Sequence, residues 1–182
     1  VLRPDDTIDS VLRKIRLATI LGTYQSTLTD FRYVRPVWKR NAEEERLLGV
    51  SFTGVFDCPV VLNATPDQLN DMKLHAVETN KLWARKLKIN QSVATTCIKP
   101  SGTVSQLSGV AGSGLHPSYS KYYIRRVRQD IKDPLNATLI EAGVPYRVDP
   151  YNKDAFVFEF PTKAPPKSIT KDKVGAIEHL EI

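Results

Sequence analysis

The chain has 182 residues, which is enough for one domain with a hydrophobic core but short for two. Hydrophobic residues make up 41% and charged residues 25%, values that exclude a fibrous or generally disordered chain. The net charge of +6 favours contact with phosphates, but 20 acidic residues against 26 basic ones do not require nucleic acid. No apolar run approaches the roughly 20 residues that span a bilayer. We therefore expect a soluble, cytoplasmic protein without a membrane partner.

The two cysteines, Cys58 and Cys97, lie far apart and form no CxxC motif. A disulfide framework or a zinc site is therefore not expected. Neither cysteine has an acid or a histidine close in sequence that would tune a thiolate. We predict that both are buried structural residues, with Cys97 in the core of a strand.

In the first third of the chain, apolar residues at three- and four-residue spacing predict a helix from Ile8 to about Leu21, capped by Thr7 or Asp9. The segment 31–38 is interpreted as an irregular connector. Acidic residues 43–45 predict a short helix after Asn41, with the acids near its N-terminus.

A strand, helix, strand order is predicted next. The apolar, β-branched run 47–56 favours a buried strand, and Thr65 with Pro66 starts a helix that runs to about Lys88. A second strand covers Val93 to Ile98. This order favours parallel packing of the two strands.

Further on, we predict a strand over 122–127, a helix from about Pro134 that ends at Gly143, and a strand over 155–160 that carries phenylalanines on one face. Residues from about 162 onward are expected to be a linker followed by the start of another helix.

The segment Cys97–Pro117 is the candidate functional stretch. Pro100 ends a predicted strand, and small and hydroxyl residues follow where a helix could start. Unpaired N–H groups at a helix N-terminus and the helix dipole favour an anion, and glycine lets a phosphate approach the backbone closely. Because serine and threonine are also ordinary helix caps, a simple capped turn remains the alternative.

Four motifs occur in an order that resembles ribonucleotide reductase catalytic subunits, of the monomeric adenosylcobalamin-dependent (class II) ribonucleoside-triphosphate reductase type. They read Arg-Leu-Leu-Gly-Val-Ser-Phe-Thr-Gly-Val-Phe-Asp at 46–57, Lys-Pro-Ser-Gly-Thr-Val-Ser at 99–105, Gly-Ser-Gly-Leu-His-Pro at 112–117 and Tyr-Tyr-Ile-Arg-Arg at 122–126. The resemblance covers roughly residues 9–160. The motif at 100–103 alone would be weak, whereas four in order are specific.

The resemblance implies an α/β fold: part of the ten-stranded α/β barrel of the ribonucleotide reductase and glycyl-radical type, from its second half-barrel. Residues 1–182 would then form a single partial domain. The chain would be a fragment that leaves an apolar face uncovered and that is inactive alone.

In such reductases the loop 101–105 holds the substrate's phosphates through backbone amides and hydroxyls. Carried over, the resemblance implies the phosphate-binding residues Ser101, Gly102, Thr103, Val104 and Ser105. It further implies adenosylcobalamin as cofactor, a ribonucleotide substrate, the remainder of the reductase chain and a thioredoxin-type reductant as partners, and thiyl-radical reduction to deoxyribonucleotides. The family's radical-forming cysteine and its reducing cysteine pair have no counterpart in Cys58 or Cys97, so no catalytic residue is assigned.

Two other functions were weighed against this one. Aromatic and basic residues in the fourth motif suggest a nucleic-acid-binding or other phosphate-binding module without catalysis, but no recognised nucleic-acid-binding signature accompanies them. They are Tyr122, Tyr123, Arg125, Arg126 and Arg128. A P-loop NTPase is disfavoured because the required Gly-x-x-x-x-Gly-Lys-[Ser/Thr] motif is missing and Lys99 precedes the loop instead of following its second glycine.

Overall fold

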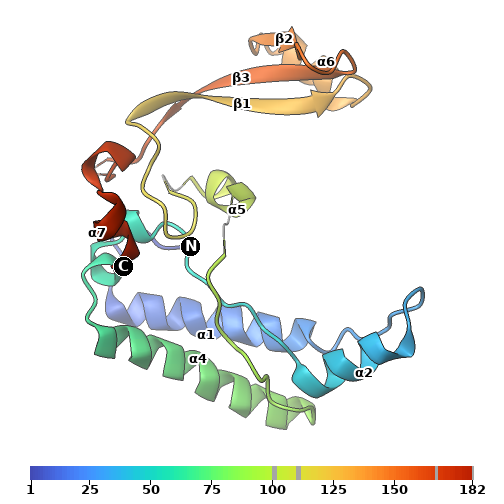
Figure 1. Cartoon of the computed structure of the whole chain (residues 1–182), viewed down its shortest axis with the longest axis vertical. Helices are drawn as coiled ribbons and strands as arrows, with labels where there is room; N and C mark the ends of the chain where they lie inside the picture. The colour runs from blue at the N-terminus through green and yellow to red at the C-terminus, as the bar shows by residue number, and fades with distance from the viewer. Residues whose placement is uncertain (100–101, 110–111, 167, 182) are drawn as a thin grey trace.

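The protein is represented by a computed structural model that describes residues 1–99, 102–109, 112–166 and 168–181. Figure 1 shows two regions: a group of long helices at one end and a three-stranded sheet with one helix at the other. Short helices and irregular segments connect them. The helices are α1 (Ile8–Gln25), α2 (Pro36–Glu45), α3 (Pro59–Leu62), α4 (Pro66–Leu87), α5 (Gly102–Leu107), α6 (Leu135–Glu141) and α7 (Ala176–Leu180). The strands are β1 (Tyr122–Asp130), β2 (Tyr146–Val148) and β3 (Ala155–Lys163).

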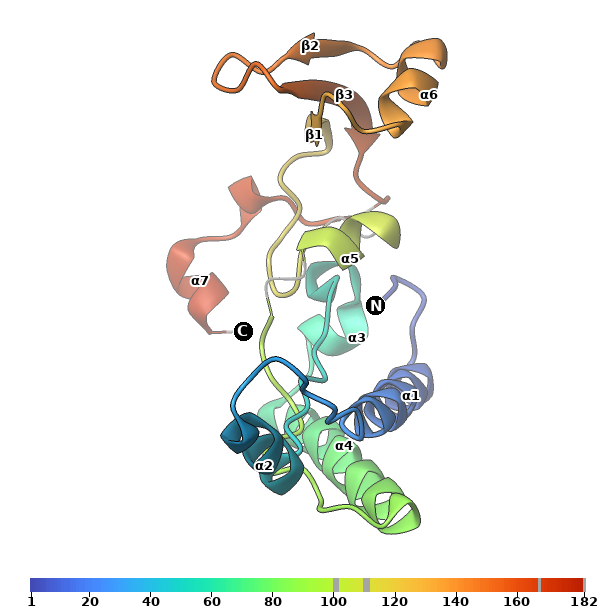
Figure 2. The same cartoon turned by 90° about the vertical axis from the view of Figure 1, so that its right-hand side faces the viewer.

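The two long helices, α1 and α4, lie side by side and follow the sequence patterns closely (Figures 1 and 2). Thr7 caps α1 in a capping box with Ser10, and Thr65 caps α4 in a capping box with Gln68. Each box satisfies backbone donors that a helix start leaves unpaired. The predicted bounds of both helices are confirmed within a few residues.

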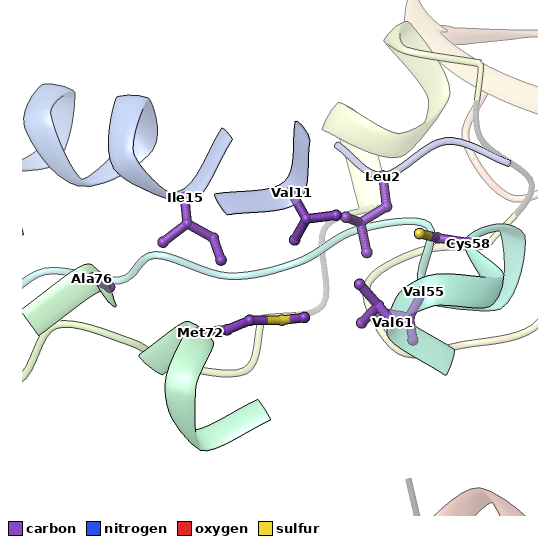
Figure 3. Packing of buried hydrophobic residues seen from close by; sticks show 8 residues of the cluster. All are labelled: Leu2, Val11, Ile15, Val55, Cys58, Val61, Met72 and Ala76. Carbon is purple, nitrogen blue, oxygen red and sulfur yellow. The ribbon is translucent and has the colours of Figure 1, made fainter. Parts of the chain in front are cut away.

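The hydrophobic core lies where these helices meet the chain segments near α3. Figure 3 shows side chains from the N-terminal segment, α1, α3, α4 and the 3₁₀ turn η1 (Val55–Asp57) converging on one cluster. Its members are Leu2, Val11, Ile15, Val55, Cys58, Val61, Met72 and Ala76. Cys58 is fully buried here, which confirms its prediction as a structural residue.

Helix α2 corrects the prediction for this part of the chain. It begins at Pro36, five residues before Asn41, because proline is preorganised for the first helical turn. The acidic residues 43–45 consequently lie in its last turn, where the helix dipole disfavours them. Arg46 then ends the helix in a left-handed conformation.

The strand predicted over 47–56 was wrong in extent, and so was the strand over 93–98. The two segments do run parallel, but the described part forms only the isolated bridge between Val50 and Thr96. Backbone bonds such as Leu48 N–H to Ala94 O (2.9 Å) extend the contact to a few residues. Gly54, with φ of 81°, then turns the chain into η1. Among the described residues, neither segment has a second strand beside it. Two strands alone are only marginally stable, so neither segment forms a regular strand over its whole predicted length.

The sheet has the order β1-β3-β2 and is antiparallel throughout. The strand predicted over 155–160 is confirmed as part of β3, the central strand, and Phe158 is fully buried. Helix α6 leads from β1 to β2, and Gly143 follows it with φ of 75°, as predicted for a residue that ends a helix.

The C-terminal segment, expected to be a linker, is tied back to the residues that precede β1. Ser118 N–H donates to Ile169 O at 2.9 Å, and Lys171 N–H donates to Ser118 O at 2.8 Å. The turn η2 (Lys171–Lys173) and α7 follow. None of the helices among the described residues has the length and apolar character needed to cross a membrane.

Candidate phosphate-binding site

Helix α5 starts within the predicted loop, as the pattern of small and hydroxyl residues indicates. Gly102 is its first residue and is exposed; Thr103 follows in the same turn. A Cβ placed on Gly102 would meet no heavy atom within 4 Å, so the approach to this backbone is open. Pro100 and Ser101 lie outside the described residues. The helix start therefore offers backbone donors on an accessible side.

The other two predicted ligands point in different directions. Val104 is 54% exposed, so its side chain faces solvent. Ser105 is completely buried, and its hydroxyl donates a 3.2 Å hydrogen bond to Gly102 O. That bond holds the first turn together, so the Ser105 hydroxyl would have to exchange its partner before it could donate to a ligand.

The glycine-rich loop after α5 is held by the first motif. Gly114 N–H donates to the Thr53 hydroxyl at 2.8 Å, in a buried position, and Val55 N–H lies 3.4 Å from Gly114 O. Gly112 packs so closely that a Cβ would stand 1.9 Å from His116 O. The loop therefore requires glycine at 112 for steric reasons.

Lys99 lies against the first motif from the other direction. A Cβ on Gly49 would be 2.8 Å from Lys99 Cε and 3.1 Å from Cys97 Sγ. Lys99 is exposed, in agreement with the expectation of a solvated side chain. Cys97 is also exposed, which corrects its prediction as strand core. Its segment lacks the neighbouring strand that would have covered it.

The first motif thus contacts the second through Lys99 and the third through Gly114. The third and fourth also share a surface hollow of about 720 Å³, which extends from Ser113 and His116 to the first half of β1. The sequence does not predict this hollow, because the third motif and the strand over 122–127 form it only after folding. The signal was the clustering of tyrosine and arginine just after a loop.

No set of three or more metal-ligating side chains occurs among the described residues. A cleft of about 1040 Å³ lies between α1, α2 and residues 46–51, with apolar side chains such as Leu21, Leu28 and Trp38 in its lining. No cobalamin-binding residue is assigned in it.

Comparison with known proteins gives a consistent family. Adenosylcobalamin-dependent ribonucleoside-triphosphate reductase of Lactobacillus helveticus is 38% identical over 173 residues, which are 80% of this chain and 23% of that protein. The Levilactobacillus brevis enzyme of the same name is 27% identical over 168 residues, 78% of this chain and 22% of that protein. The Lactobacillus acidophilus enzyme is 39% identical over 88 residues, which are 48% of this chain and 12% of that protein.

A crystal structure of a B12-dependent (class II) ribonucleotide reductase matches with a TM-score of 0.65 and 23% identity, and the match covers 86% of this chain and 26% of that one. It shows a shared fold over this segment. No family model matches the chain. The chain spans no more than about a quarter of the length of the relatives cited here.

The fold and the ordered motifs therefore define a mixed α/β segment of the ribonucleotide reductase type. More particularly, the chain is homologous to a part of the adenosylcobalamin-dependent ribonucleoside-triphosphate reductases.

Proposed function

We propose that this chain is a segment of the catalytic domain of a reductase that converts ribonucleoside tri- or diphosphates to 2′-deoxyribonucleotides by thiyl-radical chemistry. The observation that carries the proposal is the 38% identity across 80% of the chain to a reductase of this type, supported by the contacts of the first motif with the second and the third. Unrelated phosphate-binding modules have no reason to share this order of motifs.

Within that enzyme the segment's role is to hold the substrate's phosphates at the start of α5. The backbone N–H groups of Gly102, Thr103 and Val104 would face the phosphate, with the dipole of the helix adding to the attraction. The hydroxyls of Ser101 and Thr103 would donate hydrogen bonds to the phosphate. Ser105 would donate either its backbone N–H or its hydroxyl, the latter after its hydrogen bond to Gly102 O is broken. The loop fixes the ribose relative to groups elsewhere and performs no bond-breaking itself.

The segment is further proposed to be one partial domain, from the second half of a ten-stranded barrel. The parallel contact between 47–50 and 94–97, on either side of α4, is the local geometry that barrel strands would extend. The exposed apolar side chains of the α1–α2 cleft support contact with the remainder of the reductase chain. Leu21 is 70% exposed and Leu28 is 73% exposed, and both line this cleft. An exposed apolar patch of this kind is typical of a surface that contacts another part of a protein.

Adenosylcobalamin would be bound outside the described residues and would supply the radical. A thioredoxin-type partner would restore the reducing thiols of the whole enzyme. Neither Cys58, which is buried in the core, nor the exposed Cys97 is assigned to that chemistry.

The test is a kinetic comparison in the intact protein. The double variant Ser101→Ala/Thr103→Ala removes two donors to a charged group, each of which contributes about 1.5–3 kcal/mol, so the substrate KM should rise by about a hundredfold or more. Ser108→Ala, just after the last residue of α5, is the matched control, because its hydroxyl already donates to Val104 O within the chain and is not among the proposed ligands. Equal KM values for all three proteins would rule out the phosphate role. Absence of any cobalamin-dependent reductase activity in the intact protein would rule out the wider proposal.

A further inference from the structure

We propose that Thr53 and His179 are positioning residues, which hold the glycine-rich loop 112–117 from two sides and thereby fix α5 in place. The loop follows α5 in the chain, so its position limits where that helix can lie. The consequence for substrate binding rests on the phosphate role proposed for α5. The placement of the helix itself does not depend on that role.

Helix α5 has little packing of its own to hold it. Val104 is 54% exposed and Leu107 is 86% exposed, and among the described residues no other helix or strand makes extensive contact with α5. Its six residues are also fewer than the roughly 12 that a helix needs for stability without support from its surroundings. The placement of α5 therefore depends largely on the chain segments that enter and leave it.

Thr53 provides the first anchor, from a buried position in the first motif. Its hydroxyl accepts the hydrogen bond of Gly114 N–H at 2.8 Å, and its carbonyl accepts from Leu2 N–H at 2.9 Å. Gly114 has φ of 60°, a conformation that favours glycine, and is buried as well. Because a buried backbone donor without a partner is costly, the Thr53 hydroxyl determines where this part of the loop lies.

His179 provides the second anchor, from α7. Its Nε2 lies 2.8 Å from the carbonyl oxygen of Leu115, which follows Gly114 in the loop. A carbonyl oxygen only accepts hydrogen bonds, so we assign a proton to Nε2, which donates. The rings of Phe56 and His116 lie 5.8 and 5.3 Å from the imidazole, both edge to face, and restrict its rotation. Two successive loop residues are therefore held by side chains from distant parts of the sequence.

Helix α7 can serve as an anchor because the segment before it is itself tied to the rest of the protein. Ser168 Oγ donates to the Asp57 carboxylate at 2.9 Å, at the end of the first motif. Ser118, just after the loop, bonds to both Ile169 and Lys171. The first motif, the loop and the C-terminal segment thus form one hydrogen-bonded unit.

The experiment compares substrate KM values of variants of the intact protein. Thr53→Val keeps the branched shape and removes the hydrogen-bond acceptor, so KM should rise by about fivefold or more, and His179→Ala should raise it by about threefold. Thr53→Ser and His179→Gln keep the hydrogen bonds and should return KM to within about twofold of the wild-type value. A side chain that served stability alone would lower the amount of folded enzyme, and hence the apparent kcat, and would leave KM unchanged.

Thr19→Val and His75→Ala are the matched controls. Thr19 is fully buried, and its hydroxyl donates to Ile15 O within α1. His75 is half-buried on α4. Neither change touches the loop, so neither should raise KM. If the double variant Ser101→Ala/Thr103→Ala raised KM while Thr53→Val had no more effect than Thr19→Val, the inference would be overturned, as it would if Thr53→Ser behaved like Thr53→Val.

Amide chemical shifts separate this inference from the proposed function. With ¹⁵N incorporated at glycine in the intact protein, Thr53→Val should shift the signal of Gly114 and also that of Gly102, at the start of α5. If the signal of Gly102 stayed unchanged, the positioning role would fail whatever α5 binds. If it moved while Ser101→Ala/Thr103→Ala left KM unchanged, the phosphate role would fail and the positioning of α5 by the loop would stand.

Discussion

The helical region and the sheet region of this chain are stabilised in different ways. In the helical region, side chains from α1, α4 and the segments around α3 enclose a cluster with almost no exposure (Figure 3). In the sheet, β3 alone has well-buried apolar residues, while Val127, Tyr146 and Val148 on its two neighbours are 36–50% exposed. The difference indicates that hydrophobic burial dominates the first region, whereas the second depends more on cross-strand and polar contacts.

The polar contacts of the sheet are specific. Arg126 and Glu159 pair across β1 and β3, and Arg128 pairs with Asp149 just after β2. Asp149 is buried, and its other oxygen accepts from Tyr151 N–H at 2.8 Å. These contacts join the edge strands and the turn after β2 into one unit.

The largest effect should come from the helical core. Met72 is 4% exposed and lies between α1 and α4, so Met72→Ala should lower the free energy of unfolding of this region by about 2–5 kcal/mol. Hydrogen exchange measured residue by residue should show faster opening of α1 and α4 and unchanged protection of β1 and β3.

The control for this variant is Leu74→Ala on the same helix. Leu74 is 48% exposed, so the change should remain within about 0.5 kcal/mol. If Met72→Ala lowered the protection of β1 and β3 as much as that of α1 and α4, the two regions would unfold together. That result would contradict the separate stabilisation of the helical region and the sheet region.

An intermediate effect should come from the loop that joins the motifs. Gly112→Ala places a Cβ 1.9 Å from His116 O, a contact that the backbone must relieve by moving, at a cost of about 1–3 kcal/mol. Because Gly114 in the same loop is bonded to Thr53, the shift should reach the first motif and appear as chemical-shift changes at residues 53–55.

Gly175→Ala is the matched control, since its added Cβ would meet nothing within 4 Å and its φ is −72°. Similar stability and spectra for the two alanine variants would contradict the tight packing of the loop.

The sequence predicted the two long helices, α1 and α4, well because their start signals are local. Thr65, Pro66 and Gln68 specify the start of α4 within four residues, and no distant partner is needed. The strands over 47–56 and 93–98 failed because regular strands need neighbours, and the described chain gives each of them only one.

The start of α5 was predictable from the sequence, whereas the phosphate role of its residues stays a prediction. Small residues after Pro100 indicated the start of α5, and the structure begins it at Gly102. Burial of the Ser105 hydroxyl against Gly102 O could not be foreseen, because it depends on the rotation of the helix against its surroundings. The hollow beside β1 could not be foreseen either, because it forms where residues 113–120 fold against β1.

The smallest effect should come from the charge that holds the sheet, and it should depend on pH. The hydrogen bond from Tyr151 N–H lowers the pKa of Asp149 below its ordinary 3.8; partial desolvation opposes this, and the Arg128 guanidinium adds to the lowering. A carboxylate whose pKa is lower in the folded state stabilises that state above its unfolded pKa and loses this contribution as pH falls through the folded pKa. Amides of β1 and β2 should therefore exchange faster as pH falls below about 4. Asp149→Asn should weaken this pH dependence and should also reduce the protection of these amides at pH 7.

Asp154→Asn removes the same charge from an exposed position before β3 and should leave the pH profile of those amides unchanged. If both variants kept the acid-induced opening of the wild-type protein, the polar contact at Asp149 would not distinguish the sheet from the helical region.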